Sequence, residues 1–295
     1  MNTKKQPATS GLIVVDKPAG MTSHDVVARI RRIAGTRKVG HAGTLDPMAT
    51  GVLIVGIERA TKLLGYVMGH DKTYLATVRL GQRTSTDDRE GEVLGTTSTS
   101  AIDDAQISAA FAAQTGTISQ VPSAVSAIKV DGRRAYDLVR AGQDVQLAAR
   151  EVTVSAIDIH RISLGEAAEV DIEVRCSAGT YIRAIARDVG EALGVGGHLT
   201  ALRRTAIGAV DESVALGLDA LAELDDPVAV PLDEAVRRTF DVRQITVEEA
   251  RELSYGRRIG GTEDAEDVFG ALDPGGHAIA LIDGRGKPKV VFAPA

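Results

Sequence analysis

Three segments of this chain alternate apolar and polar residues with the period of two that is typical of half-buried β-strands. They cover 74–80, 151–163 and 169–176, and the last two are close enough to pair as a hairpin. Helical patterns are few and irregularly placed, most clearly over 22–33 and 179–193. A regular alternation of strands and helices would indicate a parallel sheet, so this irregular order predicts an α+β fold instead.

Length and composition exclude several classes of protein. The 295 residues suit one large catalytic body with at most one small appendage. A hydrophobic share of 44% with 25% charged residues argues against general disorder. No apolar stretch approaches the roughly 20 residues that span a bilayer, and the polar segment 1–10 resembles a flexible tail rather than a signal peptide. We therefore expect a cytoplasmic protein without a membrane partner.

The charge balance limits how this chain would bind nucleic acid. A net charge of −6 argues against indiscriminate binding, which needs broad positive potential. Only 3% of the residues are aromatic, so an extended base-stacking platform is not expected. A local basic face is indicated on the helix over 22–33 and at its exit, by Arg29, Arg31, Arg32, Arg37 and Lys38. RNA binding through so focused a patch would depend strongly on salt.

The most unusual segment is 40–51, GHAGTLDPMATG, which is too rich in glycine and proline for a helix or a central strand. Pro47 biases the preceding Asp46 toward an extended backbone, which suits a carboxylate that must point one way. The alternative is a simple Asp-Pro turn. No phosphate-loop motif occurs. The six histidines are scattered and the single cysteine is Cys176, so we expect no metal site.

A second cluster, CSAGTYIR at 176–183, leads from a strand through a glycine turn into a helix. It places Tyr181 and Arg183 near the helix start. Arg183 is then able to pair with a carboxylate brought from elsewhere in the chain. The alternative is a solvated arginine beside a half-buried tyrosine.

Eight blocks stand out along the chain, namely GLIVVDKPAG (11–20), MTS (21–23), KVGHAGTLDPMATG (38–51), ATK (60–62), DKTYLATVRLGQR (71–83), TDD (86–88), IKVDG (128–132) and CSAGTYIR (176–183). In order and spacing these blocks resemble the bacterial TruB family, the tRNA pseudouridine-55 synthases, over roughly residues 11–225. The resemblance implies isomerisation of one uridine in the T-loop of tRNA to pseudouridine. It implies no metal, nucleotide or redox cofactor.

The resemblance also implies roles for single residues. Asp46 matches the catalytic nucleophile, which attacks either the sugar C1′ or the uracil ring. Tyr74 matches the tyrosine that stacks on the target base and is a candidate for removing the C5 proton. Arg183 matches the arginine that pairs with the nucleophile and would keep Asp46 ionised.

Further residues match binding positions of the family. Tyr181 and Leu202 correspond to pocket residues around the flipped base, and His41 to the histidine that fills the space left by the extruded uridine. Asp88 corresponds to a supporting acidic residue near the site. The last two matches, expected to contact phosphate, are Lys17 and Lys62.

The implied architecture is a mixed, mainly antiparallel catalytic domain of pseudouridine-synthase type over 11–230, with a small PUA-like module over 241–295. The segment 117–146 reads as an insertion with a short helix near 135–140. By resemblance it clamps the T-arm, through Arg133, Arg134 and Arg140. Val125 stands where family members often carry tyrosine, which bears on RNA contact rather than on chemistry.

Three functions follow as hypotheses. The leading one is a monomeric enzyme acting on the T-loop of free tRNA. The second keeps the chemistry but takes another RNA, as relatives in guide-RNA complexes do. The third is a tRNA-folding chaperone whose catalysis is dispensable.

Overall fold

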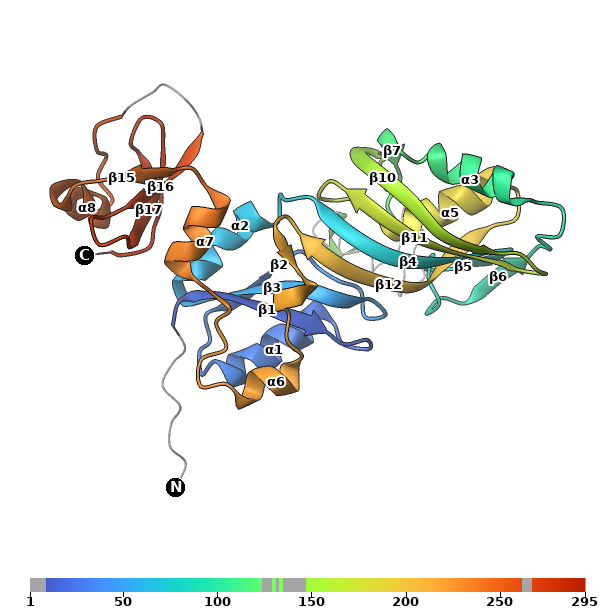
Figure 1. Ribbon diagram of the computed structural model, residues 1–295, viewed down its shortest axis with the longest axis horizontal. Coiled ribbons are helices and arrows are strands. Elements are labelled where there is room, and N and C mark those ends of the chain that lie inside the picture. The colour runs from blue at the N-terminus through green and yellow to red at the C-terminus, as the bar shows by residue number, and fades with distance from the viewer. Residues whose placement is uncertain (1–8, 124–128, 131–132, 135–146, 262–266, 295) are drawn as a thin grey trace. The chain divides into compact units, whose positions relative to one another are not determined.

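The structure, a computed structural model, describes residues 9–123, 129–130, 133–134, 147–261 and 267–294. The chain forms two compact units, which are described one at a time (Figure 1). Unit 1 comprises Met1–Asp46, Val52–Met68 and Ser213–Ala295, and unit 2 comprises Pro47–Gly51 and Gly69–Glu212.

Unit 1 is built on strands in the order β14-β1-β3, with β2 paired to β3. Their bounds are Val230–Pro231 for β14, Gly11–Lys17 for β1, Val39–Ala42 for β2 and Thr50–Ile57 for β3. Helices accompany these strands, namely α1 (Ser23–Ile33), the 3₁₀ helix η1 (Glu58–Leu63), α2 (Leu64–Val67), α6 (Leu218–Glu223) and α7 (Leu232–Thr239). The core strands β1 and β3 are almost fully buried.

Helix α1 begins where the sequence predicted. Thr22 is the N-cap, and its hydroxyl accepts a hydrogen bond from the backbone N–H of Asp25. The Asp25 carboxylate accepts from the N–H of Thr22 in return, which completes a capping box. Val26, Val27 and Ile30 lie on the buried face of the helix, so its basic residues are left on the exposed face.

The C-terminal part of unit 1 has a sheet of its own, in the order β15-β16-β17-β18. Its elements are β15 (Val242–Gln244), α8 (Val247–Ser254), β16 (Val268–Leu272), β17 (Ala278–Asp283) and β18 (Pro288–Val291). Leu253 of α8 packs in a core with Ile279 and Ile282 of β17. The sequence pattern predicts a helix over 247–255 and strands over 278–282 and 289–292, and these correspond to α8, β17 and β18. It does not predict β15 and β16, because both lack the alternation that marks a half-buried strand.

Unit 2 is centred on an antiparallel run in the order β12-β4-β11-β10-β7. The bounds are Gly197–Ile207 for β12, Lys72–Leu80 for β4, Ala168–Cys176 for β11, Arg150–Ser163 for β10 and Gly116–Gln120 for β7. The predicted hairpin is confirmed, since β10 pairs with β11 from Val154↔Cys176 to Ser163↔Glu169.

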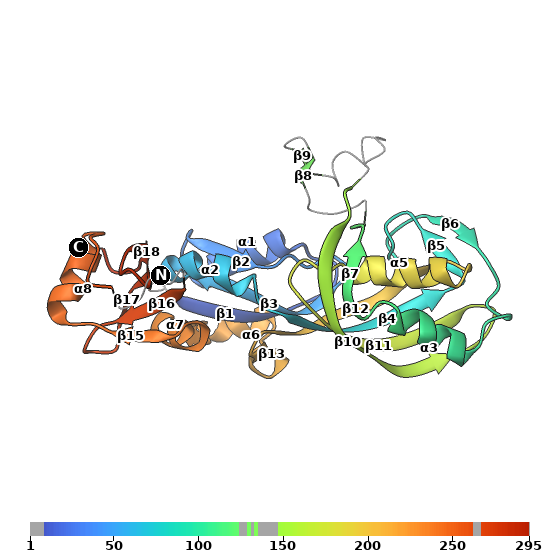
Figure 2. The same cartoon turned by 90° about the horizontal axis from the view of Figure 1, so that it is seen from above.

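Shorter elements complete unit 2. They are β5 (Gln82–Thr84) with β6 (Val93–Thr96), β8 (Lys129–Val130) with β9 (Arg133–Arg134), β13 (Val210–Asp211), α3 (Asp104–Ala112) and α5 (Ile182–Ala192). The 3₁₀ helix η2 (Glu212–Val214) lies where the chain passes from unit 2 to unit 1. Helix α5 packs on β12 and β4, and α3 packs on α5 and β10 (Figures 1 and 2). The expected α+β class, with a mainly antiparallel sheet, is confirmed.

Two glycines allow α5 to approach β12 closely. A Cβ added at Gly190 of α5 would lie 2.2 Å from the backbone nitrogen of Gly197. A Cβ at Gly197 would in turn lie 2.4 Å from the carbonyl oxygen of Ala186. The start of β12 and the end of α5 therefore pack backbone to backbone.

The segment 40–51 is less irregular than the sequence predicted. Strand β2 occupies Val39–Ala42 and pairs antiparallel with Ile54–Ile57, and β3 already begins at Thr50. Cross-strand pairing of buried backbone outweighs the low strand propensity of glycine here. Within unit 2, Gly51 has φ +96° and pairs with Arg204, whose carbonyl oxygen would lie 2.2 Å from a Cβ at position 51.

Candidate functional site

A buried ion pair forms the centre of the candidate site in unit 2. The Arg183 Nη1 lies 3.4 Å from the Asp88 Oδ2, with side chains 4% and 5% exposed. Arg183 is in the first turn of α5, and Asp88 follows β5 in the turn toward β6. The prediction that Arg183 pairs with a distant carboxylate is met by Asp88. Its predicted pairing with Asp46, which belongs to the other unit, stays a prediction.

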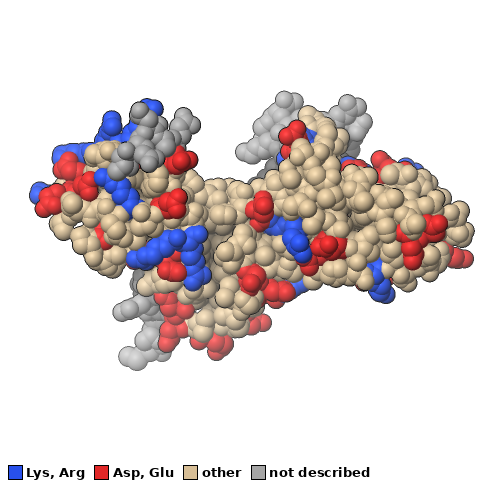
Figure 3. Space-filling model, turned by 45° about the horizontal axis from the view of Figure 1, so that its top comes forward, with Lys and Arg blue, Asp and Glu red and all other residues tan. Residues whose placement is uncertain are grey.

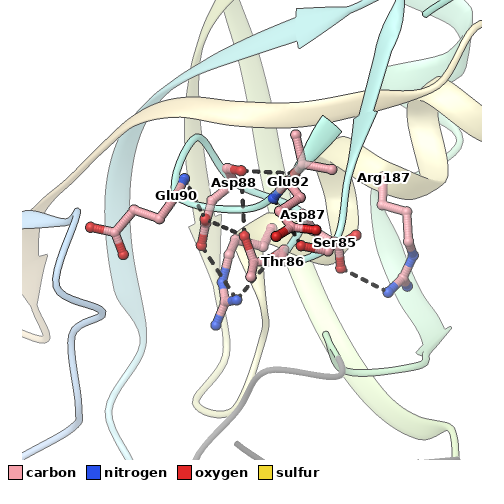
Figure 4. Close-up of polar contacts among 9 residues, drawn as sticks. Ser85, Thr86, Asp87, Asp88, Glu90, Glu92 and Arg187 are labelled. Atoms are coloured by element: carbon pink, nitrogen blue, oxygen red, sulfur yellow. Dashed lines mark hydrogen bonds and ion pairs between the residues drawn. The ribbon is translucent and has the colours of Figure 1, made fainter. Parts of the chain in front are cut away.

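The turn that carries Asp88 is held by its own hydroxyl groups (Figure 4). The Thr86 Oγ1 donates to the Asp88 Oδ1 over 2.5 Å, and the backbone N–H of Glu90 donates to the same oxygen over 3.0 Å. Thr84 donates to the Asp88 carbonyl over 2.7 Å. Arg183 also donates to the carbonyl of Thr86 over 2.9 Å. The carboxylate of Asp88 is thus fixed in direction, which a supporting acidic residue needs.

Tyr74 and Leu202 lie on the sheet face that α5 covers. Tyr74 is the cross-strand partner of Arg204 in β12, and Leu202 is the partner of Ala76 in β4. Directly opposed residues of paired strands point to the same face, and Tyr74 and Leu202 are each 7% exposed. Unit 2 therefore brings Tyr74 and Leu202 to one sheet face and Arg183 to the helix packed on that face.

Tyr181, the N-cap residue of α5, is fixed by a buried glutamine. The Gln120 side chain accepts from the Tyr181 N–H over 2.8 Å and donates to its carbonyl over 3.1 Å. The Arg150 guanidinium lies 4.7 Å from the centre of the Tyr181 ring, within the range of a cation–π contact. Arg150 also donates to the carbonyl of Gly179 over 2.5 Å. The backbone of Tyr181 is therefore held by β7, and its ring is contacted by the first residue of β10.

In unit 1, the chain next to Asp46 is fixed by Ser23. The Ser23 Oγ accepts from the N–H of Leu45 over 2.9 Å and donates to the carbonyl of Leu45 over 3.1 Å. Ser23 is 1% exposed, Leu45 is 4% exposed and Asp46 is half-buried. The backbone that leads into Asp46 is therefore tied to the first turn of α1.

Three further predicted residues of unit 1, namely His41, Lys62 and Lys17, differ in how far they are exposed. His41 in β2 is half-buried, and its ring meets that of His24 edge-on with centroids 5.6 Å apart. Lys62 is exposed, and its ammonium donates to the carbonyl of Val291 over 2.5 Å. Lys17 is 0% exposed and donates to the carbonyls of Pro18 and Met21 over 2.9 and 2.7 Å. The expected phosphate contact of Lys17 stays a prediction, and within unit 1 its ammonium is bonded to backbone carbonyls.

The basic residues expected to meet RNA are on the surface of α1 and its exit. Arg29, Arg31, Arg32, Arg37 and Lys38 are all exposed. Two of them lie near carboxylates, with Arg29 3.2 Å from Asp219 and Lys38 3.4 Å from Glu58. Figure 3 shows Lys and Arg side chains in separate groups, with Asp and Glu between them, on the face that it draws. Of the predicted clamp, Arg140, Val125 and the helix near 135–140 lie outside the described residues.

Two buried cationic residues at this end of the sheet were missed by sequence reasoning. Arg204 is 1% exposed and Lys72 7% exposed, on adjacent strands next to Tyr74. Burial, with a smaller contribution from Arg204, lowers the pKa of Lys72. Burial raises the pKa of the neighbouring Cys176 thiol to about 11. The signal in the sequence was weak, because a lysine in a strand normally belongs to the exposed face.

Arg187 was also missed, although its spacing offered a signal. It lies four residues after Arg183, so both arginines share one face of α5. Its guanidinium contacts Asp87, Asp188 and the carbonyl of Val121. Among the described residues, no group of three or more His, Cys, Asp or Glu side chains is arranged to hold a metal ion, and no helix there is long and apolar enough to cross a membrane.

The sequence matches known families over almost its whole length. Residues 31–182 match the N-terminal domain of the TruB family pseudouridylate synthases. Residues 183–237 match the C-terminal domain of tRNA pseudouridylate synthase B, and residues 240–293 match the C-terminal domain of tRNA pseudouridine synthase II.

Curated relatives and solved structures agree with these matches. The chain is 53% identical to the tRNA pseudouridine synthase B of an Arthrobacter species (strain FB24), covering 97% of both chains. It is 56% identical to the protein of the same name from a Mycobacterium species (strain KMS), again covering 97% of both. A crystal structure of a Cbf5-Nop10-Gar1 complex matches with a TM-score of 0.72 and 26% identity, covering 96% of this chain and 85% of that one.

Proposed function

The chain belongs to the TruB family of pseudouridylate synthases, and we propose that it isomerises uridine-55 in the T-loop of tRNA to pseudouridine. The reaction breaks the N1–C1′ bond, turns the uracil and joins C5 to C1′. The C5 hydrogen leaves as a proton and N1 gains one, so the product is an isomer of the substrate. No oxidant or reductant is required by this balance, and we propose that no cofactor takes part.

Asp46 is proposed as the nucleophile. A carboxylate can form an ester with C1′, or add to the uracil ring, and leave again when the new bond is made. The bonds between Ser23 and Leu45 support this role, because a misplacement of about 1 Å can slow a reaction about a hundredfold. Arg183 is proposed to stabilise the Asp46 carboxylate, in addition to its pair with Asp88.

Tyr74, Tyr181 and Leu202 are proposed to form the pocket for the flipped base. Extrusion is required because the reacting atoms are covered while the base is stacked, and it costs a few kcal/mol. An aromatic ring and an apolar side chain recover part of this cost by stacking on the base. His41 is proposed to fill the space that the uridine leaves. Tyr74, Tyr181 and Leu202, together with Arg183 and Asp88, are carried by adjoining elements of unit 2, and this is the observation that carries the proposal.

The test uses bare tRNA transcript labelled with tritium at C5 of its uridines, and the purified chain alone. The wild-type chain should release tritium from a single position in the T-loop, and Asp46→Asn should release none while still binding tRNA. Asp104→Asn, an exposed carboxylate in the first turn of α3, is the matched control and should react like the wild type.

The outcomes separate the hypotheses. If the wild type releases no tritium from free tRNA, the proposed function fails for this substrate, and the hypothesis of another RNA gains support. If Asp46→Asn reacts normally, the nucleophile is wrong but the function stands. If Asp46→Asn is inactive and yet replaces the wild type fully in cells, the chaperone hypothesis is favoured.

A further inference from the structure

All three guanidinium nitrogens of Arg187 form hydrogen bonds or ion pairs, and their partners lie in different elements of unit 2. Its Nη1 lies 3.3 Å from the Asp87 Oδ2, and its Nε and Nη2 each lie 2.8 Å from the Asp188 Oδ1. Its Nη2 also donates to the carbonyl of Val121 over 2.8 Å. The side chain is 20% exposed. A rigid guanidinium fork held at three points fixes the relative positions of the groups that it contacts.

The first of these groups belongs to the turn that holds Asp88. Asp87 has φ +59°, which makes it one of two described non-glycine residues with a positive φ. Its carbonyl accepts from the N–H of Leu199 in β12 over 3.0 Å. Such a conformation persists only where the surroundings hold it, and it is common at functional sites. The turn is thus held by Arg187 at Asp87 (Figure 4). It is also held by Arg183, at Thr86 and Asp88.

The second group lies at the end of β7. Val121 directly follows Gln120, the buried residue whose amide is bonded to the backbone of Tyr181. One side chain therefore joins the end of β7 to the turn that carries Asp88.

We propose that Arg187 is a positioning residue that holds the Thr86–Asp88 turn at a fixed position relative to the end of β7. In this arrangement the end of β7 and the Arg183–Asp88 pair keep fixed relative positions. Without Arg187 the chain still binds RNA. The side chains of Arg183 and Asp88 are then held less firmly in position, so the isomerisation slows. This role rests on the proposed function, since it assumes that Arg183 and Asp88 serve the reaction.

The first experiment compares single-turnover kinetics and tRNA affinity for Arg187→Met and the wild type. We expect the rate constant to fall about tenfold or more, as small displacements of catalytic groups cause, while the Kd for tRNA changes little. Arg187→Lys, which keeps the charge but not the fork, should recover part of the rate. Glu191→Gln, which changes an exposed carboxylate on the same helix, is the control and should react like the wild type.

A second readout does not depend on activity. Amide hydrogen exchange should show loss of protection at Leu199 and Glu90 in Arg187→Met, because their N–H groups donate to the carbonyl of Asp87 and the carboxylate of Asp88. Asp87→Asn should show the same loss if Arg187 acts through Asp87. Asparagine tolerates a positive φ, so this variant removes the charge without adding backbone strain.

The results discriminate clearly. An unchanged rate constant in Arg187→Met overturns the proposal, and so does unchanged exchange protection. A smaller active fraction and a lower Tm with a normal rate constant would mean that Arg187 is merely structural. A wild-type chain that does not act on tRNA refutes the proposed function instead, and the exchange experiment still decides whether Arg187 orders the turn.

Discussion

The hydroxyl of Ser23 is bonded to both backbone groups of Leu45, accepting from its N–H over 2.9 Å and donating to its carbonyl over 3.1 Å. Both residues are buried, so water does not replace these bonds when the hydroxyl is removed. One side chain of α1 thus sets the path of the chain immediately before Asp46. This relationship leads to the first prediction.

Ser23→Ala should lower the free energy of unfolding by about 1–3 kcal/mol, because it leaves a buried N–H and a buried carbonyl without their partner. It should also slow tritium release from labelled tRNA while tRNA affinity stays the same. Urea unfolding and single-turnover kinetics measure the two effects. Ser254→Ala, which removes a bond to the carbonyl of Ala250 within α8, is the control and should alter neither strongly. Equal stability of Ser23→Ala and wild type would contradict the prediction.

Replacing Arg183 by methionine should lower the free energy of unfolding more than replacing its partner Asp88 by asparagine. Arg183→Met leaves the buried carboxylate of Asp88 without its cation, and breaking a buried pair in this way costs about 3–5 kcal/mol. Asp88→Asn should cost less, because an amide oxygen still accepts from Thr86 and Glu90. Denaturant unfolding of both variants gives the comparison. A smaller loss in Arg183→Met than in Asp88→Asn would argue against the pair as the anchor of the turn.

Gly190→Ala should destabilise the protein, although alanine is the better helix former. Its Cβ would lie 2.2 Å from the backbone of Gly197, and the overpacking that follows costs about 1–3 kcal/mol or more. Gly65→Ala in α2 is the matched control, since no atom lies within 4 Å of the added Cβ. The control should be neutral or gain up to about 1 kcal/mol from helix propensity. Thermal unfolding of the two variants tests whether α5 and β12 pack backbone to backbone.

The single cysteine offers a test of pH dependence. Burial raises the pKa of the Cys176 thiol to about 11 from an ordinary value of 9.0. The folded state therefore holds the thiol proton more tightly than the unfolded state, so this contribution to stability is complete below pH 9 and is lost as the pH rises toward 11. The stability difference between wild type and Cys176→Ala should shrink over that window.

The same thiol should be unreactive in the folded protein. Thiolate is the reactive form, and Cys176 is both 1% exposed and protonated at neutral pH. Alkylation at pH 8 should be slow under native conditions and complete in denaturant. Fast alkylation of the native chain would show that the end of β11 opens readily.

Much of the local structure could be predicted from local patterns. The β10–β11 hairpin follows from two adjacent alternating segments, and the start of α1 follows from a hydroxyl before an aspartate with an apolar face behind it. By residue type alone, Thr22 and Ser23 are equally suited to be the N-cap, because each carries a hydroxyl just before the helical pattern. The structure uses Thr22 as the cap and turns Ser23 inward to Leu45, a choice that depends on a contact 22 residues away.

Partners that are distant in sequence could not be predicted in the same way. Arg183 was expected to pair with a carboxylate, but spacing does not tell which one, and Asp88 is brought to it by the β5–β6 turn. Buried cations such as Lys72 and Arg204 were missed because residue type alone assigns them to the surface. The roles of Asp46 and its neighbours came from resemblance to a family, and they stay predictions until the variants are measured.

The enclosed ammonium of Lys17 has a use in footprinting. Acylating reagents modify amines that they can reach, so an exposed residue such as Lys62 should be labelled while the chain is folded. Lys17, 0% exposed and surrounded by the carbonyls of its own turn, should be labelled only when β1 detaches. The rate of acylation of Lys17, followed by mass spectrometry of its peptide, would then report the rate at which unit 1 opens globally.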